Sequence, residues 1–288
     1  MPTPFLHGRP LFAVVVFDPV RTSRPFTPTH ESGRNMISQI KPESGHYLYA
    51  IADALEPHLD YESMGINGAA VYTIAQGPVL AVVSDINEKR LRPERKNLAA
   101  HNTVIKRLME ETTVLPVAFG TIAGSNQSLV KILKDNRATF VEQLDLVRGK
   151  VELGLRVVLD VPNIFAYMVG RHQELADLRD EVLGRQHGPS QNDKIEMGRL
   201  FDHLLQQDRE LHAACAIEVL GSRCVDIKQN PCREEKEVMH LACLVDRCAM
   251  KEFEDGVFEA AKLFDNNFAF DFNGPWAPHH FVNMALAA

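Results

Sequence analysis

The stretch AAVYTIAQGPVLAVV, residues 69–83, has the pattern of two β-strands joined by a tight turn. Residues 69–75 and 79–83 are mostly small, β-branched or aromatic, and Gln76-Gly77-Pro78 supplies turn residues between the two runs. This pattern is typical of a β-hairpin. The hairpin is the point from which the rest of the fold can be worked out.

The segments around the hairpin predict further strands and helices. Residues 46–52 and 113–120 are rich in apolar residues and predict strands, whereas the chain after Pro93 takes on the spacing of an amphipathic helix. We expect Ser125 or Asn126 to cap a helix that runs to Val147, without a full capping box, because neither has Glu or Gln three residues on. Residues 150–160 alternate like a half-buried strand.

This order of elements predicts an α+β fold in which residues 44–160 form a modified ferredoxin-like domain. We expect one sheet with helices on one face. A helical connecting region is expected over residues 161–218, with its best linker candidate at residues 185–192. Strands at residues 224–228, 237–245 and 268–272 and a helix at residues 251–264 then predict a second, smaller α+β domain with a terminal tail, residues 219–288.

The start of the chain differs in composition from the rest. Six of the 16 prolines precede Met36, and no helical or alternating pattern is present beyond the short apolar run at residues 11–17. We therefore expect residues 1–43 to be a Pro-rich, disordered extension, with Met36 as a natural start of the protein. The apolar run is too short to span a bilayer, and because only Arg9 precedes it as a fixed positive charge and no small-residue cleavage site follows soon after it, we do not expect a signal peptide.

The overall charge argues against two classes of partner. With 31 Lys+Arg and 38 Asp+Glu, the 288-residue chain has a net charge of −7, so we expect no nucleic acid and no lipid membrane as partners. One basic island stands out against this background, with only Glu88 and Glu94 opposing it: Lys89, Arg90, Arg92, Arg95, Lys96, Lys106 and Arg107. It lacks interleaved aromatics for base stacking, and we interpret it as a solvated helix entry or a surface for an acidic protein partner.

No catalytic motif selects a reaction. The phosphate-binding and hydrolase motifs are missing from the sequence, and the turn at residues 120–125 is better explained by its own geometry and a helix cap than by anion binding. The five cysteines lie between Cys215 and Cys248 at irregular spacings, which favours reduced cysteines in the cytoplasm over a disulfide framework or zinc site. We therefore expect no enzyme activity, no cofactor and no metal.

Three motifs carry a resemblance to a known family. They are VLPVAFGT at residues 114–121, GKVELGLR at residues 149–156 and GPWAPHHFV at residues 274–282, supported by the strand at residues 47–51 and by His101. In this order and spacing they resemble the GvpF/GvpL family of gas vesicle proteins, over about residues 45–282. One departure is that the family often has Tyr-Ser or a similar pair where His279-His280 stand.

The resemblance implies a cytoplasmic, non-enzymatic accessory protein of gas vesicles. It implies a role in assembly or as a minor structural component, through contact with the main hydrophobic shell protein and other accessory proteins. The candidate interaction residues are the signature positions Pro116, Phe119, Gly120, Thr121, Lys150, Glu152, Gly154, Arg156, Gly274, Pro275, Trp276, Pro278 and Phe281. Three alternatives stay open: these residues only build the fold, the chain is a ferredoxin-like small-molecule-binding regulatory module, or it is a metal-dependent enzyme that uses the late Cys and His residues.

Overall fold

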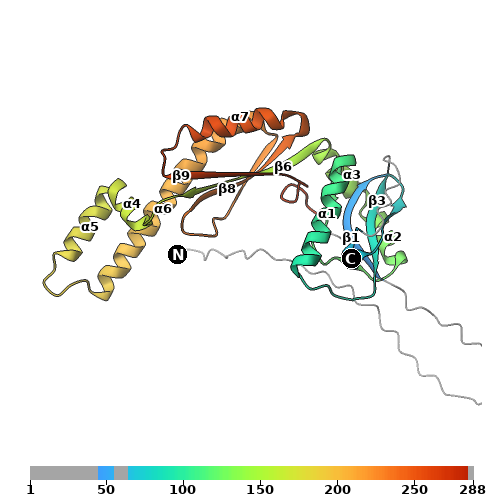
Figure 1. Ribbon diagram of the computed structural model, residues 1–288, viewed down its shortest axis with the longest axis horizontal. Coiled ribbons are helices and arrows are strands. Elements are labelled where there is room, and N and C mark those ends of the chain that lie inside the picture. The colour runs from blue at the N-terminus through green and yellow to red at the C-terminus, as the bar shows by residue number, and fades with distance from the viewer. Residues whose placement is uncertain (1–44, 55–63, 285–288) are drawn as a thin grey trace, which may run out of the picture. The chain divides into compact units, whose positions relative to one another are not determined.

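The computed structural model describes residues 45–54 and 64–284, and within it the chain forms two compact units. Among the described residues, one unit comprises those up to Arg148 together with residues 282–284, and the other comprises Gly149–Phe281. Both contain an antiparallel sheet and helices (Figure 1). The expected disordered extension at residues 1–43 and the start at Met36 lie outside the described residues.

The sheet of the first unit contains the predicted hairpin. Its strands are β1 (Gly45–Asp53), β2 (Val71–Gln76), β3 (Val79–Ile86), β4 (Val114–Pro116) and β5 (Ile122–Ala123), and a 3-10 turn spans Ile66–Gly68. The strand order is β2-β3-β1-β4, with β5 also paired to β1, and all pairs are antiparallel. The turn between β2 and β3 places Gly77 at a φ of 66°, a conformation that favours glycine.

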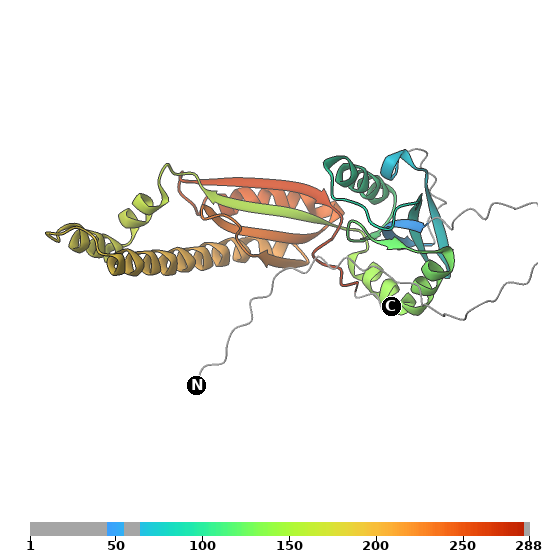
Figure 2. The ribbon, with the colours of Figure 1, turned by 90° about the horizontal axis from the view of Figure 1, so that it is seen from below.

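Helices cover both faces of this sheet. Figures 1 and 2 show α1 (Arg95–Glu111) on one face, and α2 (Asn126–Asp135) and α3 (Arg137–Val147) on the other. The expectation of helices on one face was wrong, because β1 is buried along both of its faces and its nearly continuous apolar sequence needs cover on each side. The single helix expected up to Val147 is divided at Asn136.

The second unit repeats the strand order of the first. Its strands are β6 (Lys150–Leu159), β7 (Asp226–Asn230), β8 (Glu237–Asp246) and β9 (Phe268–Trp276), in the antiparallel order β7-β8-β6-β9. The helices α6 (Gln191–Leu220) and α7 (Met250–Ala261) lie on one face of this sheet (Figure 2). Short 3-10 turns at Gly221–Arg223 and Arg247–Ala249 precede β7 and α7.

The helical region belongs to the second unit. Helices α4 (Ile164–Arg171) and α5 (Gln173–Leu183) pack against the first half of α6 and extend beyond the sheet (Figure 1). The expected domain boundary after residue 160 was therefore wrong: β6 is a central strand of the second sheet, and residues 161–218 lie within that unit between β6 and β7. Alternation reveals a half-buried strand but does not indicate which sheet it joins.

Two local features bear on the sequence analysis. Ser125 caps α2 by accepting the Ser128 N–H, and the Ser128 hydroxyl accepts the Ser125 N–H, so a serine completes the capping box that was not expected there.

The ferredoxin-like assignment of the first unit stays a prediction, because residues 55–63, between β1 and β2, lie outside the described residues. None of the described helices is both long and apolar enough to cross a membrane.

Candidate functional site

The signature residues of the first unit lie around a buried aromatic cluster. The Tyr47 hydroxyl accepts the Gly120 N–H at 3.2 Å and lies 3.0 Å from Nδ1 of His101. The His101 ring stacks on Tyr49 and meets Phe119 edge to face, with ring centroids 5.8 and 5.6 Å apart. The motif at residues 114–121, the strand at residues 47–51 and His101, quoted separately for the resemblance, thus meet in one place.

The chain geometry of this motif explains two of its residues. Gly120 has a φ of 89°, which favours glycine, and the Thr121 hydroxyl donates to the Ala118 carbonyl at 2.8 Å. Pro116 is buried at the end of β4, opposite Ala50 of β1. Burial also raises the pKa of Tyr47, so its hydroxyl keeps its proton and serves as a neutral hydrogen-bonding group. These contacts support a structural role for the motif.

The signature residues of the second unit lie on the sheet face opposite α6 and α7. Glu152, Gly154 and Arg156 alternate on this face of β6, while Leu153 and Leu155 point toward the helices and are buried. Lys150 begins the same strand. The neighbouring strand β9 places Asn273 opposite Gly154 and Trp276 opposite Glu152, so two motifs that are far apart in the sequence become neighbours.

Gly154 provides the space that positions the tryptophan. A Cβ atom at residue 154 would lie 2.5 Å from Oδ1 of Asn273, and this same oxygen accepts the indole N–H of Trp276 at 2.9 Å. Gly274, at a φ of 120° before a cis Pro275, forms the irregularity in β9 between these two side chains. The Trp276 side chain is held by this bond while 48% of the residue stays exposed.

The segment after Trp276 folds back over the same sheet face. Nδ1 and the backbone N–H of His280 contact the two oxygens of the buried Glu152 carboxylate at 2.6 and 2.9 Å. Pro278 and Phe281 are buried, and Nζ of Lys228 lies 5.3 Å from the Phe281 ring centroid while donating to the His280 carbonyl. The hydrogen bond to Glu152 raises the pKa of His280.

Arg156 occupies a second ion-pair cluster on this face. Its guanidinium donates to Glu237 at 2.9 Å and to Glu234 at 3.1 Å. Burial of Glu237 would raise its pKa, but the Arg233 N–H and the Arg156 guanidinium outweigh burial and lower it. The carboxylate therefore stays ionised, and the cluster ties β6 to the start of β8.

The structure thus divides the thirteen candidate residues into two groups. Pro116, Phe119, Gly120 and Thr121 belong to the first unit, and the other nine gather on β6, β9 and the terminal segment of the second. Sequence reasoning missed the Asn273 and His280 contacts. Asn273 directly precedes the Gly-Pro-Trp motif, which is the signal that could have drawn attention to it.

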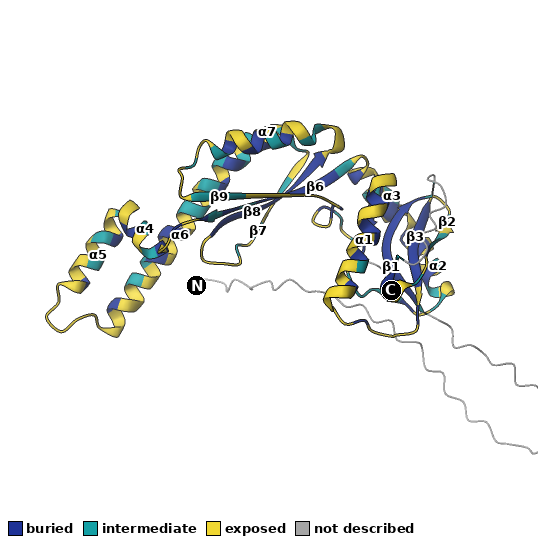
Figure 3. Cartoon of the chain, viewed as in Figure 1, coloured by how far each residue is buried: buried dark blue, intermediate teal, exposed yellow. Residues whose placement is uncertain are grey.

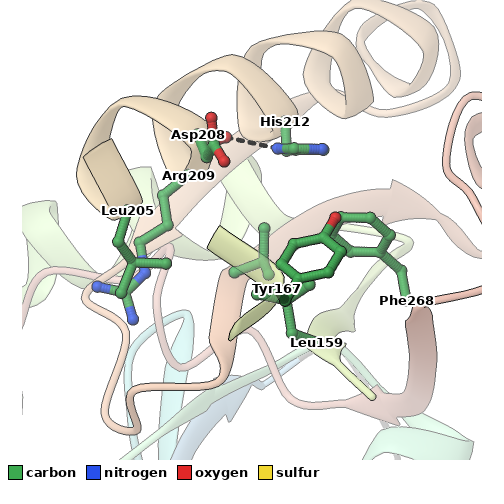
Figure 4. Close-up of a pocket in the computed structure, with 8 residues that line it drawn as sticks. Leu159, Tyr167, Leu205, Asp208, Arg209, His212 and Phe268 are labelled. Carbon is green, nitrogen blue, oxygen red and sulfur yellow. Dashed lines mark hydrogen bonds between the residues drawn. The ribbon is translucent and has the colours of Figure 1, made fainter. Parts of the chain in front are cut away.

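A small pocket in the second unit lies away from these residues. Figure 4 shows it between α6 and the sheet, lined by Tyr167, Asp208, His212 and Phe268 among others, with Nδ1 of His212 2.6 Å from the Asp208 carbonyl oxygen. Its volume of about 10 Å³ is room for about one water molecule, so it does not favour a small-molecule site. Among the described residues, no group of three or more His, Cys, Asp or Glu side chains gathers as a metal site.

Comparisons with known proteins agree with the arrangement of these motifs. A family model described as "Gas vesicle synthesis protein GvpL/GvpF" matches residues 45–283. The chain belongs to the GvpL/GvpF family. It is 26% identical to gas vesicle protein F of Streptomyces sp. strain CB03234, over 82% of this chain and 98% of that protein. It is 23% identical to gas vesicle protein F1 of Halobacterium salinarum, over 84% of this chain and 94% of that protein.

The fold is also shared with a solved structure of this family. The crystal structure of gas vesicle protein GvpF from Anabaena sp. PCC7120 matches with a TM-score of 0.74 at 22% identity, covering 84% of this chain and all of that chain. The mixed helix-and-sheet architecture is therefore that of GvpF. Membership of this family supports an accessory role in gas vesicles, and the family is one of gas vesicle proteins and not of enzymes.

Proposed function

We propose that this protein acts in gas vesicle assembly, or as a minor structural component, by contacting the main hydrophobic shell protein. It works without catalysing a reaction, in the cytoplasm and associated with the gas vesicle, together with other accessory proteins. Family membership supports the gas vesicle association. The observation that carries the contact itself is the position of Trp276 on the second unit.

Trp276 has the properties of an interaction anchor. Its residue is 48% exposed, yet its indole N–H is bonded to Asn273, so the ring is already fixed before a partner arrives. A fixed side chain loses little conformational entropy on binding, and tryptophan is enriched among the residues that dominate interface energies. Phe272 of the same strand points to the other sheet face, where its ring centroid lies 6.0 Å from that of Phe253 on α7, so the anchor is Trp276 itself. The contact would therefore centre on the end of β9.

Co-precipitation with the main shell protein tests this proposal. We expect Trp276→Ala to reduce recovery of the shell protein by about tenfold, since anchor residues typically cost about 1.4 kcal/mol or more when truncated. Phe258→Ala is the matched control, because Phe258 is an aromatic residue 61% exposed on α7 of the same unit. Circular dichroism would establish that both variants fold.

Two outcomes would count against the proposal. Equal recovery of the shell protein with wild type and Trp276→Ala would remove Trp276 as the anchor. Normal gas vesicles in a strain that lacks this chain would contradict a role in assembly.

A further inference from the structure

Five cations lie together at the entry to α1, and residues 88–96 contain two acidic residues, Glu88 and Glu94, against them. The five cations are Lys89, Arg90, Arg92, Arg95 and Lys96, and we name them the basic patch. All five are exposed. Nζ of Lys96 lies 3.5 Å from Oε2 of Glu94. Within the described part of the chain, the other four cations form no ion pair. The protein as a whole carries a net charge of −7, so the charge of this patch is opposite in sign to that of the whole protein.

The backbone that carries the patch is anchored at several points. Leu91, within the patch, is only 6% exposed, and Nδ2 of Asn97 donates to the Arg92 carbonyl at 3.1 Å. The Glu94 carbonyl accepts the N–H groups of Asn97 and Leu98. Figure 3 shows the segment leading into α1 as largely exposed. The cations therefore stand on an ordered backbone, which lowers the entropy cost of binding a partner.

The position of the patch is unfavourable for the folded chain alone. Helix α1 begins at Arg95, and the N-terminus of a helix carries partial positive charge that favours acidic side chains. The first turn of α1 has no acidic residue, and the Glu94 side chain makes no capping bond. Lys106 follows Arg95 by three helical turns and extends the positive charge along the same face. A negatively charged partner would relieve this repulsion.

We propose that the basic patch binds an acidic segment of a partner protein, a short run of Asp and Glu residues. The extent of the patch suits a few carboxylates, and charge complementarity of this kind accelerates association and selects partners. A long nucleic acid would meet the negative charge of the rest of the protein, and the patch has no interleaved aromatic side chains on which bases could stack. The proposal concerns a different unit from Trp276 and does not rest on shell-protein contact.

Fluorescence anisotropy with the full chain tests the proposal. The probe is a labelled peptide of consecutive glutamates, and a glutamine peptide of equal length is the reference. We expect the triple variant Lys89→Gln, Arg90→Gln, Arg92→Gln to weaken binding of the glutamate peptide by about tenfold, and we expect wild-type binding to weaken as salt is raised. If the triple variant does not fold, Arg90→Gln alone should weaken binding about twofold to threefold.

A matched control variant removes the same charge elsewhere on the first unit. Lys131, Lys134 and Arg137 are exposed on α2 and α3, and Lys131→Gln, Lys134→Gln, Arg137→Gln should leave binding within about twofold of wild type. Equal weakening by both triple variants, or no binding of the glutamate peptide to wild type, would overturn the proposal. Tighter patch-dependent binding of single-stranded DNA or of phosphatidylserine vesicles would overturn it in favour of that ligand.

Discussion

Replacing His280 with alanine should destabilise the second unit in a pH-dependent way. His280 supplies the 2.6 Å contact to Glu152, whose residue is only 6% exposed, so the variant leaves one carboxylate oxygen without its nearest partner. A hydrogen bond to a charged group contributes about 1.5–3 kcal/mol to stability. Because the His280 side chain is 43% exposed, solvent screening lowers the expected loss to about 1–2 kcal/mol.

The sign of the pH dependence follows from the raised pKa of His280. A histidine with a raised folded-state pKa contributes stability that is fully present below its unfolded pKa, about 6.5, and is lost as pH rises through the folded value. The difference between wild type and His280→Ala should therefore be largest near about pH 6 and smaller near about pH 8.5.

Urea unfolding followed by tryptophan fluorescence measures this difference. The chain has a single tryptophan, Trp276, which is in the second unit and reports its unfolding. His279→Ala is the control, because the neighbouring histidine makes no hydrogen bond to Glu152 within the described residues. In a Glu152→Gln background the loss from His280→Ala should shrink to about 0.5 kcal/mol or less. An equal loss at both pH values, or an undiminished loss in that background, would refute the reasoning.

Two further substitutions test the glycines of the signature motifs. Gly154→Ala should displace the Asn273 side chain, lower the free energy of unfolding by about 1–2 kcal/mol and shift Trp276 emission to longer wavelength. The double variant Gly154→Ala, Asn273→Ala should lose little more stability than Gly154→Ala alone. Additive losses of stability from the two substitutions would exclude the close contact between residues 154 and 273. Gly120→Ala should cost about 1–2 kcal/mol in thermal unfolding followed by circular dichroism, because of its φ of 89°. Gly124→Ala is the control, because a Cβ atom at residue 124, like one at residue 120, would meet no atom within 4 Å, but Gly124 has no positive φ. It should change stability by about 0.5 kcal/mol or less. Equal losses of stability from Gly120→Ala and Gly124→Ala would contradict this explanation.

Local sequence patterns predicted most of the helices and strands, but they did not predict which strands pair with each other over long distances in the sequence. The hairpin of β2 and β3 follows from residues 69–83, because its turn and strands are adjacent in the sequence. The partners of β6, in contrast, begin at Glu237 and Phe268, so its sheet depends on contacts that periodicity does not encode. The capping box at Ser125 was missed since the usual partner is Glu or Gln, and here a serine hydroxyl takes that place.

The candidate site shows the same limit. The motifs around Gly154 and Trp276 carry the resemblance as two separate stretches of sequence, and the only sign that Asn273 joins them is its place directly before the second motif. Glu152 and Arg156 contact His280 and Glu237, neither of which the sequence pattern identified as their partner. Those partners come from other strands or from the terminal segment, and register decides which side chains meet.

The shared strand order of the two sheets also identifies where the chain accepts extra sequence. The connection between the first and second strands of a sheet is residues 54–70 in the first unit, whereas in the second unit it is residues 160–225 and holds α4, α5 and α6. The same junction thus carries very different lengths without a change in strand order. An affinity tag or fluorescent label inserted in the exposed turn between α5 and α6 would use this tolerance and leave both sheets intact.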